Sequence, residues 1–170
     1  IPRSTRLRPV FGWLGGKHSL KKILCSIIKK QSFSGTYFEP FCGAGSVLLK
    51  LQPKKARLND INPYLMLVFQ VLKLIPSRFM QTLETLQRPN LSIKEWYSQV
   101  LIDFNANQQH VIPHALSELT KEQLNEVLLP TARFYFLVKF SYGGIIKFTK
   151  NGMYSSCGHE NWEESLYDKD

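Results

Sequence analysis

The pattern of apolar and polar positions predicts a chain that starts as an α/β unit and continues as helices. Near the start, apolar residues recur at helical spacing with lysines on the other face, so we expect an amphipathic helix packed on a sheet. Its apolar positions are Leu20, Ile23, Leu24, Ile27 and Ile28. The apolar stretch from Tyr37 and the stretch Ala56–Ile61 then predict two short strands. A turn and an apolar helix lie between them, which is the arrangement of a βαβ unit.

The first predicted strand runs into Gly43-Ala44-Gly45, where we expect a sharp turn. Glycine tolerates positive φ and has no Cβ, so such a turn can approach a nucleotide closely, and the helix after it offers free N–H groups. The dinucleotide fingerprint needs a third glycine at position 48, which is Leu48 in this chain. This difference argues against NAD as the ligand.

Asp60 ends the second predicted strand and is a candidate for recognising a nucleoside. In a βαβ unit it lies at the tip of the neighbouring strand, where a carboxylate can accept the hydroxyls of an adenosine ribose. The alternative is that Asp60 and Asn62 only cap the next helix, with Pro63 in its first turn. The residues alone leave both interpretations open.

The rest of the pattern is helical up to a predicted hairpin. Helices are expected from Asn62 to Pro76, over 79–86, from the capping box at Ser92 to Ala106, from Thr120, and from Pro130. Residues 139–154 contain two β-prone stretches around a lysine-rich Asn-Gly turn, which predicts a β-hairpin. Its lysines can bind phosphates and its aromatic rings can stack on bases, or the rings can pack on the preceding helix.

Charge favours a polyanionic partner. The net charge is +9, and residues 1–60 hold twelve Lys or Arg against only Glu39 and Asp60. A basic field of this size suits nucleic acid, although many basic chains are simply soluble. The composition is that of a globular protein and no apolar run is long enough for a bilayer, so we expect a cytoplasmic protein without a membrane partner.

Cysteine and histidine spacing indicates no metal site. Cys25, Cys42 and Cys157 are widely separated, so we expect reduced, buried thiols and neither disulfides nor a zinc knuckle. His110 and His114 are four residues apart, but Pro113 lies between them and no Cys or acidic partner has ligand spacing.

Three motifs in the first 62 residues stand in an order and spacing that one known family shares. They are Phe11-Gly12-Trp13-Leu14-Gly15-Gly16-Lys17, Phe38-Glu39-Pro40-Phe41-Cys42-Gly43-Ala44-Gly45-Ser46 and Asn59-Asp60-Ile61-Asn62. They resemble the W-x-G-G-K, E-P-F-x-G-x-G-S and D-I-N motifs of Dam-type (D12 class) adenine-specific DNA methyltransferases. The resemblance implies an α/β fold with a Rossmann-like core that binds S-adenosyl-L-methionine. The residues it implicates in cofactor binding are Trp13, Lys17, Phe41, Gly43, Gly45, Ser46 and Asp60.

The predicted hairpin is similar to the target-recognition region of the same family, where a helical insert ends in a basic hairpin. The segment Tyr142-Gly143-Gly144-Ile145-Ile146-Lys147 resembles the family's R-Y-x-Y-N-G-L-x-R-x-N. The resemblance implies that a monomer contacts double-stranded DNA through Lys139, Tyr142, Gly143, Ile145, Lys147 and Lys150. Lysines stand at 139 and 147 where arginines are usual, and a lysine cannot copy the bidentate fork of arginine, so GATC is not assigned as the target.

The D-P-P-Y motif, which carries catalysis in this family, is absent from the 170 residues. Asn62-Pro63-Tyr64 imitates it without the second proline, and we interpret it as a helix start. We therefore expect the N-terminal portion of a longer DNA adenine methylase, inactive alone. Residues 1–61 would belong to its core, 62–158 to the recognition region and the acidic 159–170 to the return to the core. The alternative is a degenerate, non-catalytic DNA-binding fragment.

Overall fold

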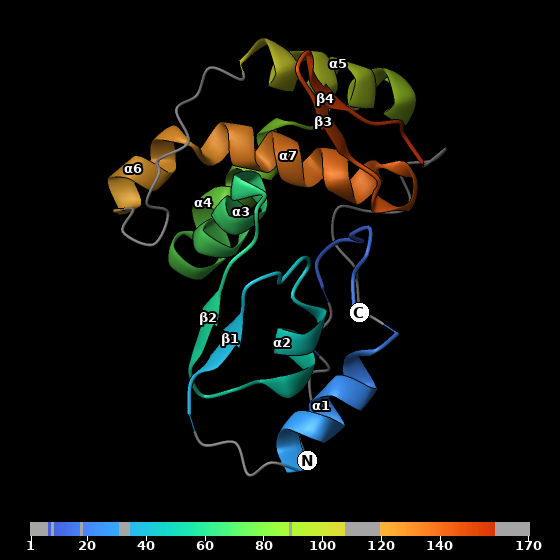
Figure 1. Ribbon diagram of the computed structural model, residues 1–170. Coiled ribbons are helices and arrows are strands. Elements are labelled where there is room, and N and C mark those ends of the chain that lie inside the picture. Colours follow the sequence, from blue (N-terminus) through green and yellow to red (C-terminus); the bar gives the residue numbers. More distant parts are fainter. Residues whose placement is uncertain are drawn as a thin grey trace, which may run out of the picture. The chain divides into compact units, whose positions relative to one another are not determined.

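Helices alternate with short strands in the first third of the chain and dominate the rest (Figure 1). The computed structural model describes residues 7, 9–17, 19–30, 35–88, 90–107 and 120–158. The elements are α1 (Lys21–Lys30), β1 (Tyr37–Glu39), α2 (Ser46–Leu51), β2 (Ala56–Leu58), α3 (Pro63–Leu74), α4 (Pro76–Thr85), α5 (Ile93–Ala106), α6 (Lys121–Glu126), α7 (Leu128–Phe140), the 3-10 turn η2 (Tyr142–Gly144), β3 (Lys147–Thr149) and β4 (Gly152–Tyr154).

The chain divides into two compact units, Ile1–Ile61 and Asn62–Asp170. The roles expected for residues 1–61, 62–158 and 159–170 stay predictions. None of the described helices is long and apolar enough to cross a bilayer. The mixture of helices with small sheets is consistent with the α/β class.

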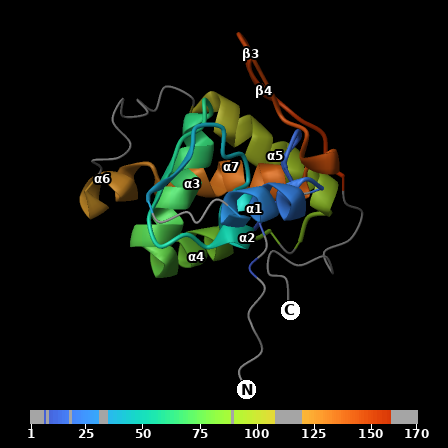
Figure 2. The same ribbon diagram turned by 60° about the horizontal axis from the view of Figure 1, so that its bottom comes forward.

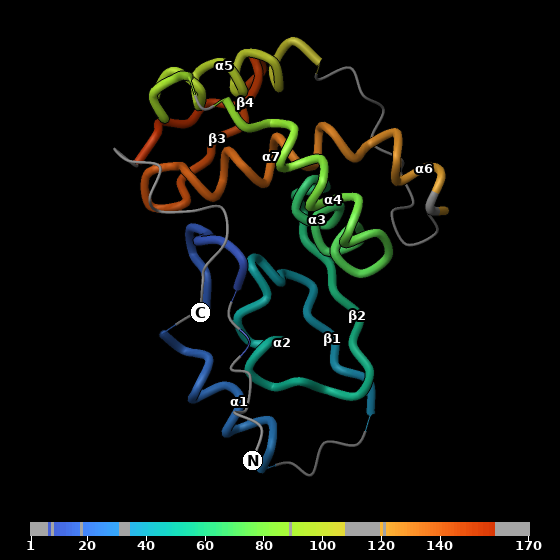
Figure 3. Tube along the Cα trace, turned by 180° about the vertical axis from the view of Figure 1, so that it is seen from behind, coloured from blue at the N-terminus to red at the C-terminus, as the bar shows by residue number. Residues whose placement is uncertain are grey.

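The first unit contains the predicted βαβ arrangement. β1 and β2 pair in parallel, with Tyr37 opposite Ala56 and Glu39 opposite Leu58. Figure 3 shows the two strands side by side, with α2 in the connection between them. Because parallel strands end at the same edge of a sheet, the segments that follow Glu39 and Leu58 emerge next to each other.

Helix α1 differs from its prediction in the face that it buries. It packs on α2 through Cys25, which is 4% exposed, while Leu20, Ile23 and Ile27 remain 54%, 59% and 51% exposed. The expectation that these three residues pack on the sheet is wrong. A helix whose main contact is a single neighbouring helix buries a narrow stripe, and here that stripe is centred on Cys25.

The sheet itself is open on the face that carries Phe38. That ring is 64% exposed, and the Arg57 guanidinium lies 6.0 Å from its centroid. The described part of the first unit therefore leaves apolar surface uncovered on both its helix and its sheet.

Helix α7 is the centre of the second unit. It contacts α3, α4, α5 and α6, and Figure 1 shows it between α5 and the pair α3 and α4. Its aromatic residues are buried, and Phe136 lies 4.1 Å from the Trp96 ring and 4.8 Å from the Phe140 ring between centroids. An aromatic helix that is apolar on nearly all sides is stable only when neighbours surround it in this way.

Local capping signals are confirmed. Ser92 and Glu95 form the capping box of α5, and Thr120 and Gln123 form that of α6. The Asn62 side chain accepts a hydrogen bond from the Leu65 N–H at 3.2 Å, so Asn62-Pro63-Tyr64 is a helix start as predicted. Leu119, expected to join a hydrophobic staple with Leu124, lies outside the described residues. Helix α7 begins two residues before Pro130, because proline is tolerated in a first turn.

The predicted hairpin is present but shorter than 139–154. β3 and β4 pair antiparallel, with Lys147 opposite Tyr154 and Thr149 opposite Gly152. Lys139 lies in the last turn of α7 and not in the hairpin, which corrects its expected place. The helix continues through Phe140 because that side chain is 2% exposed among other aromatic rings.

Candidate cofactor and DNA sites

The turn after β1 and the end of β2 are joined directly in the first unit. The Gly43 N–H donates to Oδ2 of Asp60 at 2.9 Å, and Asp60 follows the last residue of β2 by two positions. Backbone bonds of 2.9 Å from Asn59 N to Glu39 O and from Cys42 N to Asn59 O extend the pairing up to this point. The structure thus places the half-buried Asp60 carboxylate at the carboxyl edge of the sheet, beside the glycine turn.

Trp13 covers this turn. Gly43 has a φ of 51°, and a Cβ added to it would lie 3.1 Å from Cδ1 of the Trp13 ring. A side chain at position 43 would meet both a strained backbone and the indole. The Trp13 loop is closed by a 2.9 Å bond from the Gly16 N–H to the Trp13 carbonyl. Trp13, Gly43 and Asp60 are therefore brought together, and their part in cofactor binding stays a prediction.

Lys17 is anchored from the same loop. Its ammonium donates to Oε1 of Glu39 at 3.2 Å and to the Phe41 carbonyl. Glu39 is only 5% exposed, and its Oε2 accepts no hydrogen bond from a described residue. The sequence interpretation did not assign Glu39 to the site, although it is the one acidic residue before Asp60.

The remaining cofactor candidates make their contacts in this turn mainly through backbone groups. Gly45 has a φ of 71° and its N–H donates to the Cys42 carbonyl at 3.0 Å. Ser46 is 6% exposed, and the Phe41 side chain is 73% exposed while its carbonyl binds Lys17. The N–H groups at the start of α2 were expected to face a ligand. Because α2 has only six residues, we assign no binding role to its N-terminus.

None of the three cysteines forms a disulfide in the part of the chain that the structure describes. Cys25 and Cys42 are buried as expected, whereas Cys157 is half-buried, which corrects its prediction. Burial, with Asp60 and Glu39 nearby, raises the pKa of Cys42 to about 12. A neutral thiol beside the glycine turn is not a nucleophile at physiological pH.

The DNA candidates gather at the hairpin of the second unit, with one exception. Tyr142 and Ile145 are 67% and 36% exposed, and Gly143, Lys147 and Lys150 are exposed as well. Figure 2 shows β3 and β4 projecting beyond the helices of this unit. Lys139 is the exception, because it is half-buried in α7.

Three polar residues that the sequence interpretation missed fix the base of the hairpin. The Asn105 amide donates to the Met153 carbonyl at 2.9 Å and accepts from the Met153 N–H at 2.8 Å. The Tyr97 hydroxyl donates to Ser155 Oγ at 2.7 Å, and Ser155 donates to the Ile145 carbonyl at 2.9 Å. Helix α5 therefore holds β4 through side chains, and no local motif could have predicted contacts over 48 and 58 positions.

The aromatic residues of the hairpin divide into two kinds. Phe148 stacks on Tyr64, with ring centroids 6.2 Å apart and an interplanar angle of 4°. Tyr64 is 7% exposed and also packs on Phe134, so one face of the Phe148 ring packs on the helices while the side chain remains 47% exposed. Tyr142 and Tyr154, at 67% and 66% exposure, face outward instead. Phe148 therefore packs on α3 and not on the preceding helix α7, and base stacking by the exposed tyrosines stays a prediction.

No group of three or more His, Cys, Asp or Glu in the described ranges could hold a metal ion. His110 and His114 lie outside those ranges. The acidic stretch 159–170 also lies outside them.

Comparison with known proteins identifies the family. A family model of D12 class N6 adenine-specific DNA methyltransferases matches residues 13–161. The chain is 32% identical to the type II methyltransferase M.MjaIII of Methanocaldococcus jannaschii, over 88% of this chain and 51% of that protein. It is 26% identical to the DNA adenine methylases of Vibrio cholerae, over 85% of this chain and 45% of that protein, and of Escherichia coli K12, over 87% and 46%. The chain spans about half the length of these curated relatives, and it belongs to the D12 class N6 adenine-specific DNA methyltransferase family.

Proposed function

We propose that the chain is the N-terminal portion of an enzyme that uses S-adenosylmethionine to methylate N6 of adenine in duplex DNA. The observation that carries the proposal is the bond between Gly43 and Asp60 at the carboxyl edge of a parallel strand pair, where α/β proteins bind nucleotides. The D-P-P-Y motif is absent from the 170 residues, so catalysis belongs to a longer parent chain and this chain alone does not transfer methyl groups.

The residues at this edge fit the cofactor of a methyltransferase. A glycine turn with positive φ at Gly43, a half-buried carboxylate at Asp60 and a buried Glu39 oxygen without a described donor are features that suit a nucleoside with amine and hydroxyl groups. When bound, S-adenosylmethionine supplies a methyl group activated by its sulfonium sulfur.

Each residue has a distinct part in holding that cofactor. Asp60 accepts ribose hydroxyls, and its bond from Gly43 fixes the orientation of the carboxylate. Lys17 uses two of its three N–H donors on Glu39 and Phe41, which leaves one for a ligand and holds the ammonium in place. Trp13 shields the turn from water, while Gly45 and Ser46 shape the backbone beside it.

The test of this site is calorimetry of S-adenosylmethionine binding to the full-length protein. Asp60→Ala should weaken binding by about 1.5–3 kcal/mol, because a charge-assisted acceptor is lost. Asp60→Asn keeps an oxygen for the Gly43 N–H and should show the loss of charge without the loss of that bond. Asn59→Ala is the matched control, since Asn59 is exposed and its amide makes only a 3.4 Å bond to the Pro40 carbonyl. Equal affinities for wild type and both Asp60 variants would remove Asp60 from the site.

The second unit supplies the DNA contact. The exposed Lys147 and Lys150 neutralise phosphates, and Gly143 and Ile145 set the shape of the turn next to Tyr142. Tyr142 presents a ring, 67% exposed, that can stack on a base of the opened duplex. Lys139, half-buried, contributes charge from the end of α7.

Duplex binding tests this assignment. Lys147→Gln with Lys150→Gln should flatten the dependence of log Kd on log salt, because fewer counterions are released. Tyr142→Ala should weaken binding by about 1–3 kcal/mol, the value of one stacked base, without changing that slope. Tyr135→Phe is a control ring, since Tyr135 is 7% exposed and packs on Phe79. Unchanged slope and affinity in these variants would place the DNA elsewhere.

A further inference from the structure

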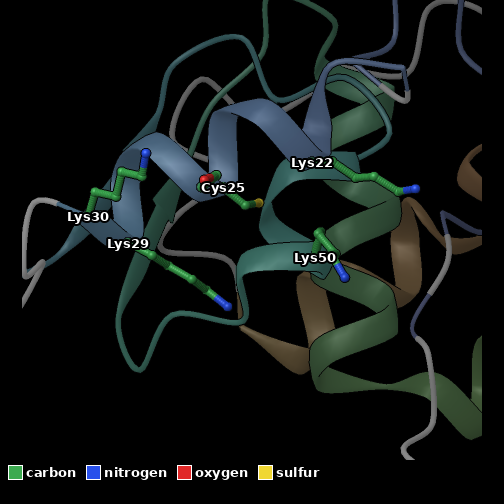
Figure 4. Close-up of a pocket in the computed structure, with 6 residues that line it drawn as sticks. Lys22, Cys25, Lys29, Lys30 and Lys50 are labelled. Atoms are coloured by element: carbon green, nitrogen blue, oxygen red, sulfur yellow. The ribbon is translucent and has the colours of Figure 1, made fainter.

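A basic pocket of the first unit lies outside both proposed sites. It has a volume of about 460 Å³ and lies between α1 and α2 (Figure 4). Its lining residues are Lys22, Cys25, Ser26, Lys29 and Lys30 of α1 and Lys50 of α2. The α1 residues recur at helical spacing, so they form one face of that helix.

The charge of this pocket is not neutralised by its surroundings. No acidic residue lines it, and its four lysines are all exposed. Glu39 is committed to Lys17 and Asp60 accepts from Gly43, so the two acids of residues 1–61 are engaged elsewhere. Within the described part of the chain, none of the four ammonium groups forms a hydrogen bond or an ion pair. Like charges at this spacing repel each other, and a bound polyanion would relieve that repulsion.

The floor of the pocket adds polar groups but no negative charge. Cys25 is 4% exposed, and burial raises the pKa of its thiol, which therefore stays neutral. The exposed Ser26 hydroxyl can donate to a phosphate oxygen. No side chain that lines the pocket carries a negative charge.

The arrangement of the lysines suits a chain of phosphates more than a single one. Figure 4 shows the ammonium groups of Lys22, Lys29 and Lys50 at separate places around Cys25, without converging on one point, and Lys30 at the end of α1 away from Lys22. Ammonium groups are point charges on flexible stems, and spread in this way they can meet successive phosphates of a backbone. A single tight phosphate site would instead need them to converge.

We propose that this pocket is a second phosphate-binding surface, which the sugar-phosphate backbone of duplex DNA occupies. The proposal rests on the proposed function for the identity of the phosphate source. The hairpin of the second unit and this pocket then act as separate contacts, each contributing its own share of the salt dependence.

The test compares two charge-matched pairs of variants in the full-length protein. Lys29→Gln with Lys50→Gln removes two charges from the pocket, and Lys54→Gln with Lys55→Gln removes two exposed charges of the same unit outside it. The slope of log Kd for a duplex against log salt should fall by nearly two in the pocket pair, since each phosphate contact contributes about 0.9. The Lys54 and Lys55 pair should keep the wild-type slope. If the slope falls equally in both pairs, the lysines act only through a diffuse positive field, and the proposed binding at the pocket is wrong.

Acetylation of wild-type lysines supplies a readout that no folding defect can disturb. With duplex bound, Lys29 and Lys50 should react several-fold more slowly with an acetylating reagent than without it, while Lys54 and Lys55 keep their rates. No protection of Lys29 and Lys50 would overturn the inference. Protection by inorganic phosphate but not by duplex would also overturn the DNA assignment, in favour of a small phosphate ligand.

The hairpin pair Lys147→Gln with Lys150→Gln separates this inference from the proposed function. If the hairpin pair lowers the slope and the pocket pair does not, DNA binding at the pocket is contradicted and DNA binding at the hairpin is supported. If the pocket pair alone lowers it, the pocket stands and the hairpin assignment fails. A wild-type protein that binds no duplex overturns both.

Discussion

At the scale of single residues, Gly43 leaves no room for substitution in the turn after β1. Its φ of 51° disfavours any side chain, and Trp13 occupies the direction in which a Cβ would point. The same residue donates its N–H to Asp60, so backbone conformation, ring packing and carboxylate orientation depend on one another. The glycine motif predicted the positive φ, but the role of Trp13 as its cover required the structure.

Gly43→Ala should therefore destabilise the turn, although it adds only one methyl group and removes no side chain. The left-handed conformation costs a non-glycine residue about 1–2 kcal/mol, and the contact with Trp13 adds to this. Urea unfolding should show the destabilisation, and calorimetry should show weaker S-adenosylmethionine binding. Gly35→Ala is the control, because a Cβ there meets nothing within 4 Å. Equal stability of the two variants would show that the turn relaxes at no cost.

At the scale of elements, the sequence predicted what is encoded locally. Capping boxes at Ser92 and Thr120 act over three residues, and the hairpin turn is short, so their helices and hairpin could be predicted from spacing. The turn itself is Lys150-Asn151, because Gly152 already pairs with Thr149. The end of α7 and the buried face of α1 could not be read, because packing against distant elements decides them. The same holds for Asn105, whose bonds to Met153 span 48 positions.

Asn105→Ala should loosen the hairpin without unfolding the helices. It leaves the Met153 N–H and carbonyl without their side-chain partner, which costs about 1–3 kcal/mol in a partly buried place. Hydrogen exchange should then be faster at Met153, and duplex affinity should fall because the hairpin is less ordered. Asn107→Ala is the control, since its amide bonds only to the Asp103 carbonyl in the preceding turn. Unchanged exchange at Met153 would show that strand pairing alone holds β4.

At the scale of the whole chain, buried neutral acids link stability to pH. Burial raises the pKa of Cys25, Tyr37, Cys42, Tyr64 and Tyr97 above their ordinary values, that of Tyr97 to about 12. These groups lie in both units, so we expect the stability of each unit to depend on pH. The sequence predicted buried thiols but could not say which tyrosines are buried, because aromatic residues occur on both the covered and the open surfaces.

Raised pKa values determine the sign of the alkaline response. Between the ordinary pKa and the raised one, the unfolded chain releases a proton that the folded chain keeps, so the unfolded state gains relative stability as pH rises. For Cys42 this window runs from 9.0 to about 12. Below pH 9 its contribution is fully present, and it is lost progressively as the pH approaches 12.

Comparison of cysteine variants isolates this contribution from that of the many lysines, which also titrate at high pH. Wild-type stability in urea should fall between pH 9 and pH 11, with a slope of up to about 1.4 kcal/mol per pH unit for each such group. Cys42→Ala should have a shallower slope than wild type over this range, even though it is less stable at pH 7. Cys157→Ala is the matched control for the loss of a thiol, because Cys157 is half-buried. Identical slopes for wild type and Cys42→Ala would show that the Cys42 thiol ionises as easily in the folded protein as in the unfolded one, and that its burial is not maintained in solution.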